Sequence, residues 1–232
     1  MRSVQLRLLI WNIFHGRAVP SARRELLREF ADELFGWEWD AALLQEVPPW
    51  WPERLAARPG VYQRSVLTSR NGLLPVRRAL ASRWPDLARS HGGGANAILV
   101  RDWGIADHRA VRLCRLPERR WMHAVRLEPA GVWVGNLHCS GADRRASREA
   151  ARAGTALLEW ADGSPAILGG DFNLLAPAVD GFADAGGYYV DHVLVSGTVA
   201  PADSTRTLTA GRLSDHRPVA ATVECGAMSL AA

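Results

Sequence analysis

Several candidate strands of this 232-residue chain end in polar residues that are costly to bury. They are Asn12, Glu46, Asn136 with His138, Asp171 with Asn173, Asp191 with His192, and Asp215 with His216. Because side chains alternate along a strand, residues two apart, such as Asp171 and Asn173, can point into one cleft. Carboxylates gathered there repel one another unless a cation lies among them. We therefore expect one site built from carboxylates, carboxamides and imidazoles.

The types of ligand atom indicate which metal such a site would bind. Glu46, Asp171 and Asp215 offer hard oxygen atoms. The chain has few cysteines and no paired histidines of the kind that make up zinc sites. Oxygen ligands of this kind suit Mg²⁺ or Mn²⁺ better than Zn²⁺. The sequence therefore predicts a magnesium or manganese site.

Each motif also has a purely structural interpretation. GDFN at 170–173 can be an Asx turn that closes a strand, and SDHRP at 214–218 can be a turn that stops at a proline. Glu46 can be an edge carboxylate, and Asn12 can simply satisfy backbone groups. Taken singly, these interpretations are the better ones. They do not explain why all the motifs occur in one chain, each directly after an apolar strand.

Strands and helices must position these residues. Hydrophobic patterning predicts strands at 4–12, 40–47, 97–101, 108–116, 121–129, 132–139, 165–173, 187–197 and 218–225. Helical spacing predicts helices over 21–35, with Ser21 as N-cap, and over 143–161. The proline-rich segment 48–60 predicts a loop with a helical turn or two, and 61–89 has no clear pattern. This mixture, without strict βαβ alternation, repeats or a linker, predicts an α/β fold in a single domain over residues 1–232.

Composition narrows the classes of function. All 28 cationic residues are arginine, which excludes lysine Schiff-base chemistry and a P-loop lysine. The three cysteines are odd in number and widely spaced, and the N-terminus lacks a signal-peptide pattern, so we expect a cytoplasmic protein without a membrane span. The net charge of +4 permits a polyanionic partner, although the chain has no basic tract.

The motifs LLIWNI, ALLQEV, GNLHCSG, ILGGDFN, VDHVLVSG and LSDHRPV together resemble the endonuclease/exonuclease/phosphatase superfamily. The resemblance runs from Leu8 to Val223, and GGDFN followed downstream by SDHRPV is its most specific part. It implies a four-layer α/β sandwich in which two mixed, mostly antiparallel sheets pack face to face. The helices are expected outside the sheets, and the active site at one rim.

The resemblance also implies a role for each carboxylate and carboxamide motif. Glu46 matches the principal metal ligand of the family, and Asn12 matches the asparagine beside it. Asp171 and Asn173 match the pair that positions the attacking water. Asp215 matches a terminal carboxylate near the metal.

The expected imidazoles complete the site. His216 matches the imidazole that contacts a phosphate oxygen, and Asp191 matches the carboxylate that orients it. His138 stands where deoxyribonuclease-like and sphingomyelinase-like members have histidine and apurinic endonucleases have tyrosine, which argues against an abasic-site repair enzyme. Asn136, and Asn96 in the family-like segment GANAILVR, are candidates for substrate binding.

The implied activity is metal-dependent hydrolysis with Mg²⁺ or Mn²⁺ as cofactor. In-line attack of water on a phosphate ester spreads charge over the non-bridging oxygens, which a dication and imidazoles stabilise. We expect a phosphodiesterase, most simply a nuclease, with nucleic acid as substrate and no protein partner. A phosphomonoesterase or a sphingomyelinase-like lipid phosphodiesterase is the alternative on the same fold. A non-catalytic binding module is the alternative from another class.

Aromatic and basic residues bear on the nucleic-acid hypothesis. Ten tryptophans are unusual for this length, and those in or beside expected loops either stack on bases or fill the core. They are Trp50, Trp51, Trp84, Trp103 and Trp121. Arginines in segments 82–93 and 141–148 are the expected contacts to a phosphate backbone.

Overall fold

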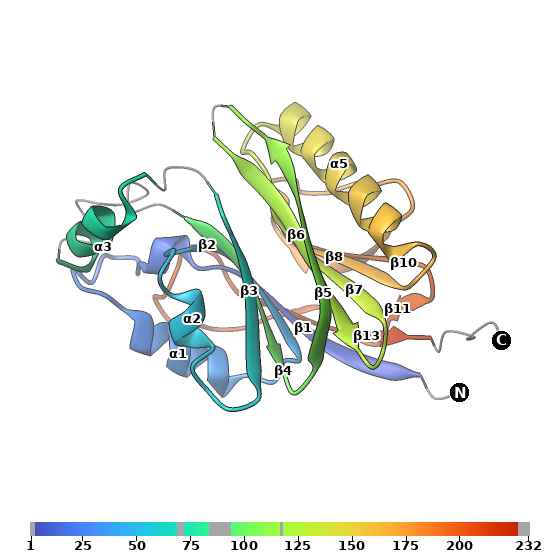
Figure 1. The fold of residues 1–232 in the computed structure, drawn as a ribbon, viewed down its shortest axis with the longest axis horizontal. Helices are drawn as coiled ribbons and strands as arrows, with labels where there is room; N and C mark the ends of the chain where they lie inside the picture. The colour runs from blue at the N-terminus through green and yellow to red at the C-terminus, as the bar shows by residue number, and fades with distance from the viewer. Residues whose placement is uncertain (1–2, 69–71, 84–93, 117, 227–232) are drawn as a thin grey trace.

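The computed structural model describes residues 3–68, 72–83, 94–116 and 118–226 of the chain (Figure 1). Within them the strands form a seven-stranded and a six-stranded sheet. The larger sheet has the spatial order β11 (Val199–Pro201), β13 (Val219–Cys225), β1 (Val4–Asn12), β2 (Ala41–Val47), β4 (Ala95–Arg101) and β3 (Val61–Leu67), with β12 (Arg206–Thr207) also paired to β13. The smaller has the order β5 (Gly104–Cys114), β6 (Arg120–Glu128), β7 (Val132–His138), β8 (Ala166–Asp171), β10 (Asp191–Ser196) and β9 (Ala183–Tyr188).

Strand directions make both sheets mixed. Strand β1 is parallel to β2, and β7 is parallel to β8. The other neighbouring pairs of the described strands are antiparallel. The two sheets share one apolar core, to which strands of both contribute. The predicted sandwich of two mixed, mostly antiparallel sheets is therefore confirmed.

Strand β1 explains why the sheets must be covered on both sides. Leu8 and Ile10 point into the core between the sheets. Leu9 and Trp11 point to the opposite face and pack under helix α1 (Leu27–Gly36). A strand that is apolar on both faces is stable only between two other layers. The continuous apolar run at residues 8–11 thus requires the outer helical layer.

The second outer layer is helix α5 (Asp143–Ala161), whose bounds match the prediction. Its buried residues Ala150 and Leu157 pack with Leu137 and Leu168 of the six-stranded sheet. Figure 1 shows α5 lying along this sheet. The shorter helices are α2 (Pro52–Leu55), α3 (Leu74–Arg83) and the 3-10 turn η1 (Phe14–Gly16). Within the described part of the chain, no helix is both long and apolar enough to cross a membrane.

The predicted start of the first helix is wrong. The helix begins at Leu27, and Ser21 does not cap it. Instead the Ser21 hydroxyl accepts a hydrogen bond from the backbone N–H of Arg23 at 3.3 Å. Arg23 has a left-handed φ of 56°, which interrupts a right-handed helix. Serine forms such local turns as readily as it caps helices.

The segment 187–197 is not one strand, as predicted, but the tight hairpin between β9 and β10. Tyr189 has a left-handed φ of 57° and turns the chain. The register pairs Tyr188 with Asp191 across this turn. The alternation of the segment is compatible with either arrangement, so tertiary pairing decided between them. The unpredicted strand β3 and helix α3 account for most of the segment 61–89 that lacked a pattern.

The described tryptophans mostly fill the core. Trp51 is fully buried, Trp50 packs against the same cluster, and Trp103 packs against the core between the sheets. Trp121 is half-buried on β6, and Trp84 lies outside the described residues. Three of the five proposed stacking residues therefore serve packing.

Candidate active site

The polar strand ends meet at one edge of the sandwich. Asn12 ends β1 and Glu46 stands one residue before the end of β2, while His138 and Asp171 end β7 and β8, and Asp191 begins β10. Strand β1 is parallel to β2, and β7 is parallel to β8, so the C-terminal ends of each pair lie at the same edge of their sheet. Strand β10 is antiparallel to β8, so the start of β10 lies at that edge too. Contacts of β8 with β1 and β2, and of β2 with β7, bring the two edges together.

Asp171 is the centre of this arrangement. Its carboxylate accepts hydrogen bonds from Asn12 Nδ2 at 2.9 Å and from the backbone N–H of Asn173 at 3.0 Å. Its Oδ2 also lies 3.4 Å from His138 Nε2 and 3.9 Å from His216 Nε2. Burial raises the pKa of Asp171, and the charge of His216 and the bond from Asn12 partly oppose that shift. The amide of Asn12, expected beside a metal, thus holds Asp171.

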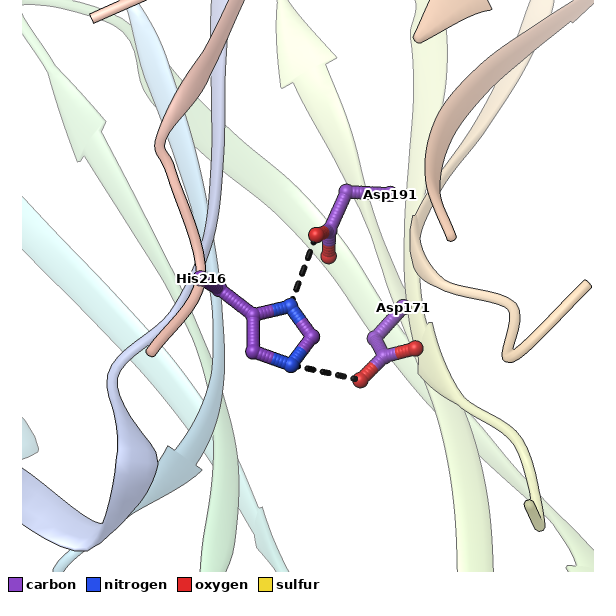
Figure 2. Close-up of side chains that lie close together, drawn as sticks. All are labelled: Asp171, Asp191 and His216. Carbon is purple, nitrogen blue, oxygen red and sulfur yellow. Dashed lines mark hydrogen bonds and ion pairs between the residues drawn. The ribbon is translucent and has the colours of Figure 1, made fainter. Parts of the chain in front are cut away.

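Asp191 and His216 form an ion pair on one side of Asp171 (Figure 2). Asp191 Oδ2 lies 2.7 Å from His216 Nδ1. Burial raises the pKa of Asp191 to about 6, although the bonded imidazole favours the ionised form. Burial opposes the charged form of His216, but Asp191, Asp171 and Asp215 outweigh it and raise the pKa to about 9. Near neutral pH the pair is carboxylate and imidazolium.

The residues before β13 fix this pair to the opposite sheet. The Ser214 hydroxyl donates to the backbone carbonyl of Asn12 at 2.6 Å and accepts from the backbone N–H of His216 at 3.0 Å. Asp215 is exposed at the rim, and its carboxylate accepts from Ser214 Oγ at 3.5 Å. The structure thus places Asp215 beside the ion pair.

Glu46 lies on the other side of the site, where β2 contains a β-bulge. The pairing of β2 with β4 shifts register between Leu44 and Val47, and Glu46 has a φ of 52°. Bulges change the direction of a side chain next to active sites. Glu46 Oε2 lies 3.1 Å from His15 Nε2, and its Oε1 lies 4.0 Å from His138 Nε2.

Half of the ten described non-glycine residues with a left-handed φ lie at this edge. Left-handed φ angles occur at five non-glycine residues of the site: Phe14, His15, Glu46, Asn173 and Ser214. Each such residue costs on the order of 1–3 kcal/mol, which persists only where the surrounding structure enforces it. Clustering of this kind is typical of functional sites. It indicates that the positions required of the side chains outweigh the unfavourable backbone conformations.

Two predicted substrate-binding residues lie deeper than expected. Asn136 is fully buried, donates from Nδ2 to the carbonyls of Leu44 and Ala97, and accepts from Gln45 Nε2 at 2.7 Å. Asn96 is also fully buried and donates to the carbonyl of Trp121 at 3.0 Å. The hydrogen bonds of Asn136 join the two sheets below His138, so its amide faces the core rather than the cleft.

Two groups of side chains could hold a metal, and Asp171 belongs to both. Asp171, Asp191 and His216 each offer one ligand atom within 4.8 Å of the others. On the opposite side, Asp171 and Glu46 both lie within 4.0 Å of His138 Nε2. Carboxylate oxygens and imidazole nitrogens together are a usual donor set for divalent cations.

A cleft of about 570 Å³ opens beside this edge, against Asn173 and His216. Its other walls include the apolar residues Leu174, Leu175 and Tyr189. Leu175 and Tyr189 are well exposed. A ligand that contacts His216 therefore has room in this cleft for a further group of partly apolar character.

The motif order and the geometry converge on one family. The model of the endonuclease/exonuclease/phosphatase family matches residues 9–216. The chain belongs to this family. Its members are hydrolases that act on phosphoesters. The resemblance inferred from the motifs is thereby confirmed.

Solved structures of the endonuclease/exonuclease/phosphatase family share the fold. A family protein from Beutenbergia cavernae is 18% identical over 97% of this chain and 72% of its own, with a TM-score of 0.71. TDP2 from Caenorhabditis elegans is 17% identical over 95% and 74%, with a TM-score of 0.64. The mannosyl-6-phosphatase Bt3783 of Bacteroides thetaiotaomicron is 17% identical over 94% and 99%, with a TM-score of 0.65. No curated protein matches this chain.

Two residues that the sequence analysis did not predict also lie near the site. His15 reaches Glu46, and Arg120 lies close enough for its charge to act on His138 and Asp171. Arg120 Nη2 pairs with Glu118 at 2.9 Å, and its buried Nε has no hydrogen-bond partner among the described residues. Strand order in the sequence could have indicated Arg120. This residue begins β6, and β6 is antiparallel to β7, so Arg120 lies beside the end of β7, where His138 stands.

Proposed function

We propose that this chain, as a single catalytic domain over residues 1–232, is a divalent-metal-dependent phosphodiesterase that cleaves its ester by in-line attack of water. The observation that supports the proposal is the position of Asp171. A buried carboxylate stands between an imidazolium, that of His216, and a second carboxylate, that of Glu46. Water held by Asp171 would face a phosphate whose oxygens contact His216.

The donor set beside Glu46 fits the expected metal. Among the described residues, the ionic partners within 4 Å of Glu46 are the imidazoles of His15 and His138, and no arginine neutralises it. We assign the metal to Glu46 with Asp171, because Asp191 and His216 already share a proton at 2.7 Å. A bound Mg²⁺ or Mn²⁺ would supply positive charge that stabilises the transition state.

The protein side chains then divide the remaining work. Asp171, held by Asn12 and Asn173, orients the water and accepts its proton. His216, kept cationic by Asp191, stabilises charge on a phosphate oxygen.

His138 and the buried asparagines take other parts. Burial, together with the charge of Arg120, lowers the pKa of His138 well below 6.5, so we assign it the role of a neutral hydrogen-bond donor. We assign Asn136 and Asn96 positioning roles between the sheets, and Asp215 an electrostatic role beside the ion pair.

The proposed substrate is a nucleic-acid phosphodiester. Arg144 and Arg148 are exposed at the start of α5, whose first residue, Asp143, lines the cleft. Cationic side chains next to the cleft would contact the flanking phosphates of a polymer. In the predicted contact segment 82–93, Arg83 ends α3 and Arg89 lies outside the described residues. We propose a cytoplasmic location and no protein partner, as the sequence predicts.

A phosphomonoesterase is the second candidate, and two observations favour it. A structural neighbour of almost the same extent is named a mannosyl-6-phosphatase. The apolar cleft wall at Leu175 and Tyr189 also suits one small organic group rather than a row of phosphates.

Removal of the central groups tests the proposal. Asp171→Asn and His216→Ala should each lower turnover by roughly 10²–10⁴-fold, and the double variant should lose little more, because the two residues act together. Asp32→Asn, an exposed substitution on α1, is the matched control and should change nothing. Hydrolysis is measured on DNA, RNA, an aryl phosphodiester and a sugar phosphate, with Mg²⁺, with Mn²⁺ and with EDTA.

The outcomes separate the candidates. Undiminished turnover in EDTA would exclude metal dependence. Cleavage of the sugar phosphate in preference to every diester would transfer the assignment to the phosphomonoesterase. Near-native turnover of Asp171→Asn, with unchanged thermal unfolding, would remove Asp171 from the mechanism.

A further inference from the structure

We propose that His15 is a nitrogen ligand of the divalent cation at Glu46, and that it biases this site toward Mn²⁺ and other transition-metal ions over Mg²⁺. The inference rests on the proposed metal dependence. It goes further because it assigns the ion preference to one residue that lies outside the motifs of the sequence analysis.

The backbone around His15 is held in a conformation that brings its side chain into the site. Phe14 and His15 have φ angles of 48° and 53°. The N–H of Phe14 donates to Asn12 Oδ1 at 3.0 Å, and the N–H of Gly16 donates to the Ile13 carbonyl at 2.8 Å. The same Asn12 side chain also holds Asp171, so the turn and the central carboxylate share one anchor.

The far end of the turn is held by packing. Gly16 has a φ of 73°, and a Cβ at this position would lie 2.4 Å from the Trp51 ring. Trp51 is fixed in turn by its buried position and by a hydrogen bond from its Nε1 to Glu25 at 3.1 Å. Both ends of the turn are therefore constrained, and His15 cannot relax to a right-handed conformation without disturbing them.

The distance between the two side chains fits a shared ion. His15 Nε2 and Glu46 Oε2 are 3.1 Å apart. Two adjacent ligands of an octahedral cation, each bound at about 2.1 Å, are about 3 Å apart. The other ring nitrogen, His15 Nδ1, is buried without a hydrogen-bond partner in the described part of the chain. Nε2 is therefore the ring nitrogen that faces Glu46 and would bind the ion.

The chemistry of the ligands gives the ion preference. Mg²⁺ prefers oxygen ligands, whereas an imidazole nitrogen raises affinity for the later divalent ions of the first transition row. His138 Nε2, at 4.0 Å from Glu46 Oε1, is the second imidazole nearby. The site at Glu46 is thus more nitrogen-rich than one built from carboxylates alone.

A purely positioning role for His15 predicts a different result for one substitution. In that role the ring N–H donates to Glu46 and binds no metal. Glutamine can donate the same hydrogen bond through its amide but offers no imidazole nitrogen. His15→Gln therefore preserves a positioning role and removes a nitrogen ligand.

The experiment measures metal binding rather than turnover. Mn²⁺ and Mg²⁺ dissociation constants are determined by calorimetry on the full chain for the wild type, His15→Gln and His138→Gln. His108→Gln, a histidine on β5 outside the site, is the matched control. Pulsed electron paramagnetic resonance of the Mn²⁺-loaded proteins then reports nitrogen nuclei coupled to the ion. Circular dichroism verifies that each variant is folded.

We expect His15→Gln to lower Mn²⁺ affinity roughly tenfold or more, with Mg²⁺ affinity changed less than about threefold, and to lose nitrogen coupling. His108→Gln should match the wild type. The role of His15 would be overturned if the ratio of Mn²⁺ to Mg²⁺ affinity were the same in the wild type and in His15→Gln. It would also be overturned if nitrogen coupling to Mn²⁺ were lost only in His138→Gln. A wild type that binds neither ion would instead overturn the proposed metal dependence, and His15 with it.

Discussion

At the scale of single residues, the site is defined by charge as much as by contact. Asp171 is buried between the cationic His216 and the neutral His138. Opposite charges nearby favour ionisation, and burial disfavours it, so each group keeps a distinct protonation state. Distinct states in neighbouring groups are what acid–base and electrostatic catalysis require.

Arg120 is the residue whose contribution can be separated most cleanly. Its charge acts on His138 and Asp171, and its buried Nε has no hydrogen-bond partner in the part of the chain that the structure describes. If it binds a phosphate oxygen, Arg120→Met should lower kcat/KM by roughly 10–100-fold, because a charge-assisted hydrogen bond contributes about 1.5–3 kcal/mol. Steady-state kinetics measures this, with thermal unfolding as a check on folding.

Arg126→Met provides the comparison for Arg120→Met. Arg126 lies on the same strand, β6, but is exposed. It should leave both kcat/KM and unfolding unchanged. Equal losses in the two variants would mean that general charge, not a specific contact of Arg120, determines the rate.

At the scale of elements, short irregular segments position the site more than the long strands do. The bulge at Glu46, the turn at Phe14–Gly16 and the segment before β13 each carry a left-handed residue. Their conformations are enforced by neighbours, as at Gly16, where no side chain fits against Trp51. Strain at these points is balanced by packing elsewhere in the sandwich.

A pair of glycine substitutions separates packing from backbone conformation. Gly16→Ala should destabilise the fold by roughly 2–4 kcal/mol, because the new Cβ adds overlap with Trp51 to the cost of a left-handed alanine. Gly163→Ala, at a φ of 80° with open space around it, should cost only about 1 kcal/mol. Denaturant unfolding measures both. Similar losses would show that Trp51 yields to the added atom and does not hold the turn.

At the scale of the whole molecule, polar side chains inside the sandwich link its stability to pH. His123 on β6 is fully buried, and its Nδ1 lies 3.2 Å from His108 Nε2. Its Nε2 has no hydrogen-bond partner within residues 3–68, 72–83, 94–116 and 118–226. Burial, with the charge of His108, lowers the pKa of His123 to about 3. The folded state therefore keeps this imidazole neutral, while the unfolded state protonates it near the usual value of 6.5.

The sign of the resulting pH dependence follows directly. The contribution of His123 to stability is complete above pH 6.5 and is lost as the pH falls toward 3, because only the unfolded chain binds the proton. At pH 5 the loss is about 2 kcal/mol, which corresponds to roughly 4–8 °C in Tm for a domain of this size. Thermal unfolding between pH 7.5 and 5 should show this loss in the wild type and a smaller one in His123→Gln. An identical decline in both would mean that His123 is protonated in the folded state.

Local patterns in the sequence predicted the strands and helices, and the family resemblance predicted that they form a layered sandwich with the motif residues at one rim. Alternation in β1, the apolar β2 and β8, and the amphipathic α5 follow from local patterns that hold wherever a strand or helix has a buried face. The polar residues at the strand ends then indicated Asn12, Glu46 and Asp171 as candidate site residues.

Only the tertiary structure decided the features that depend on distant neighbours. The turn at Tyr189 and the approach of His15 to Glu46 have no local signature. A left-handed residue is unfavourable on its own, so what stabilises it is contact with segments far away in the chain. The position of Asn136 also depends on distant neighbours. The sequence is compatible with an amide that faces the cleft or the core, and the bonds to Leu44 and Ala97 of the other sheet place it in the core.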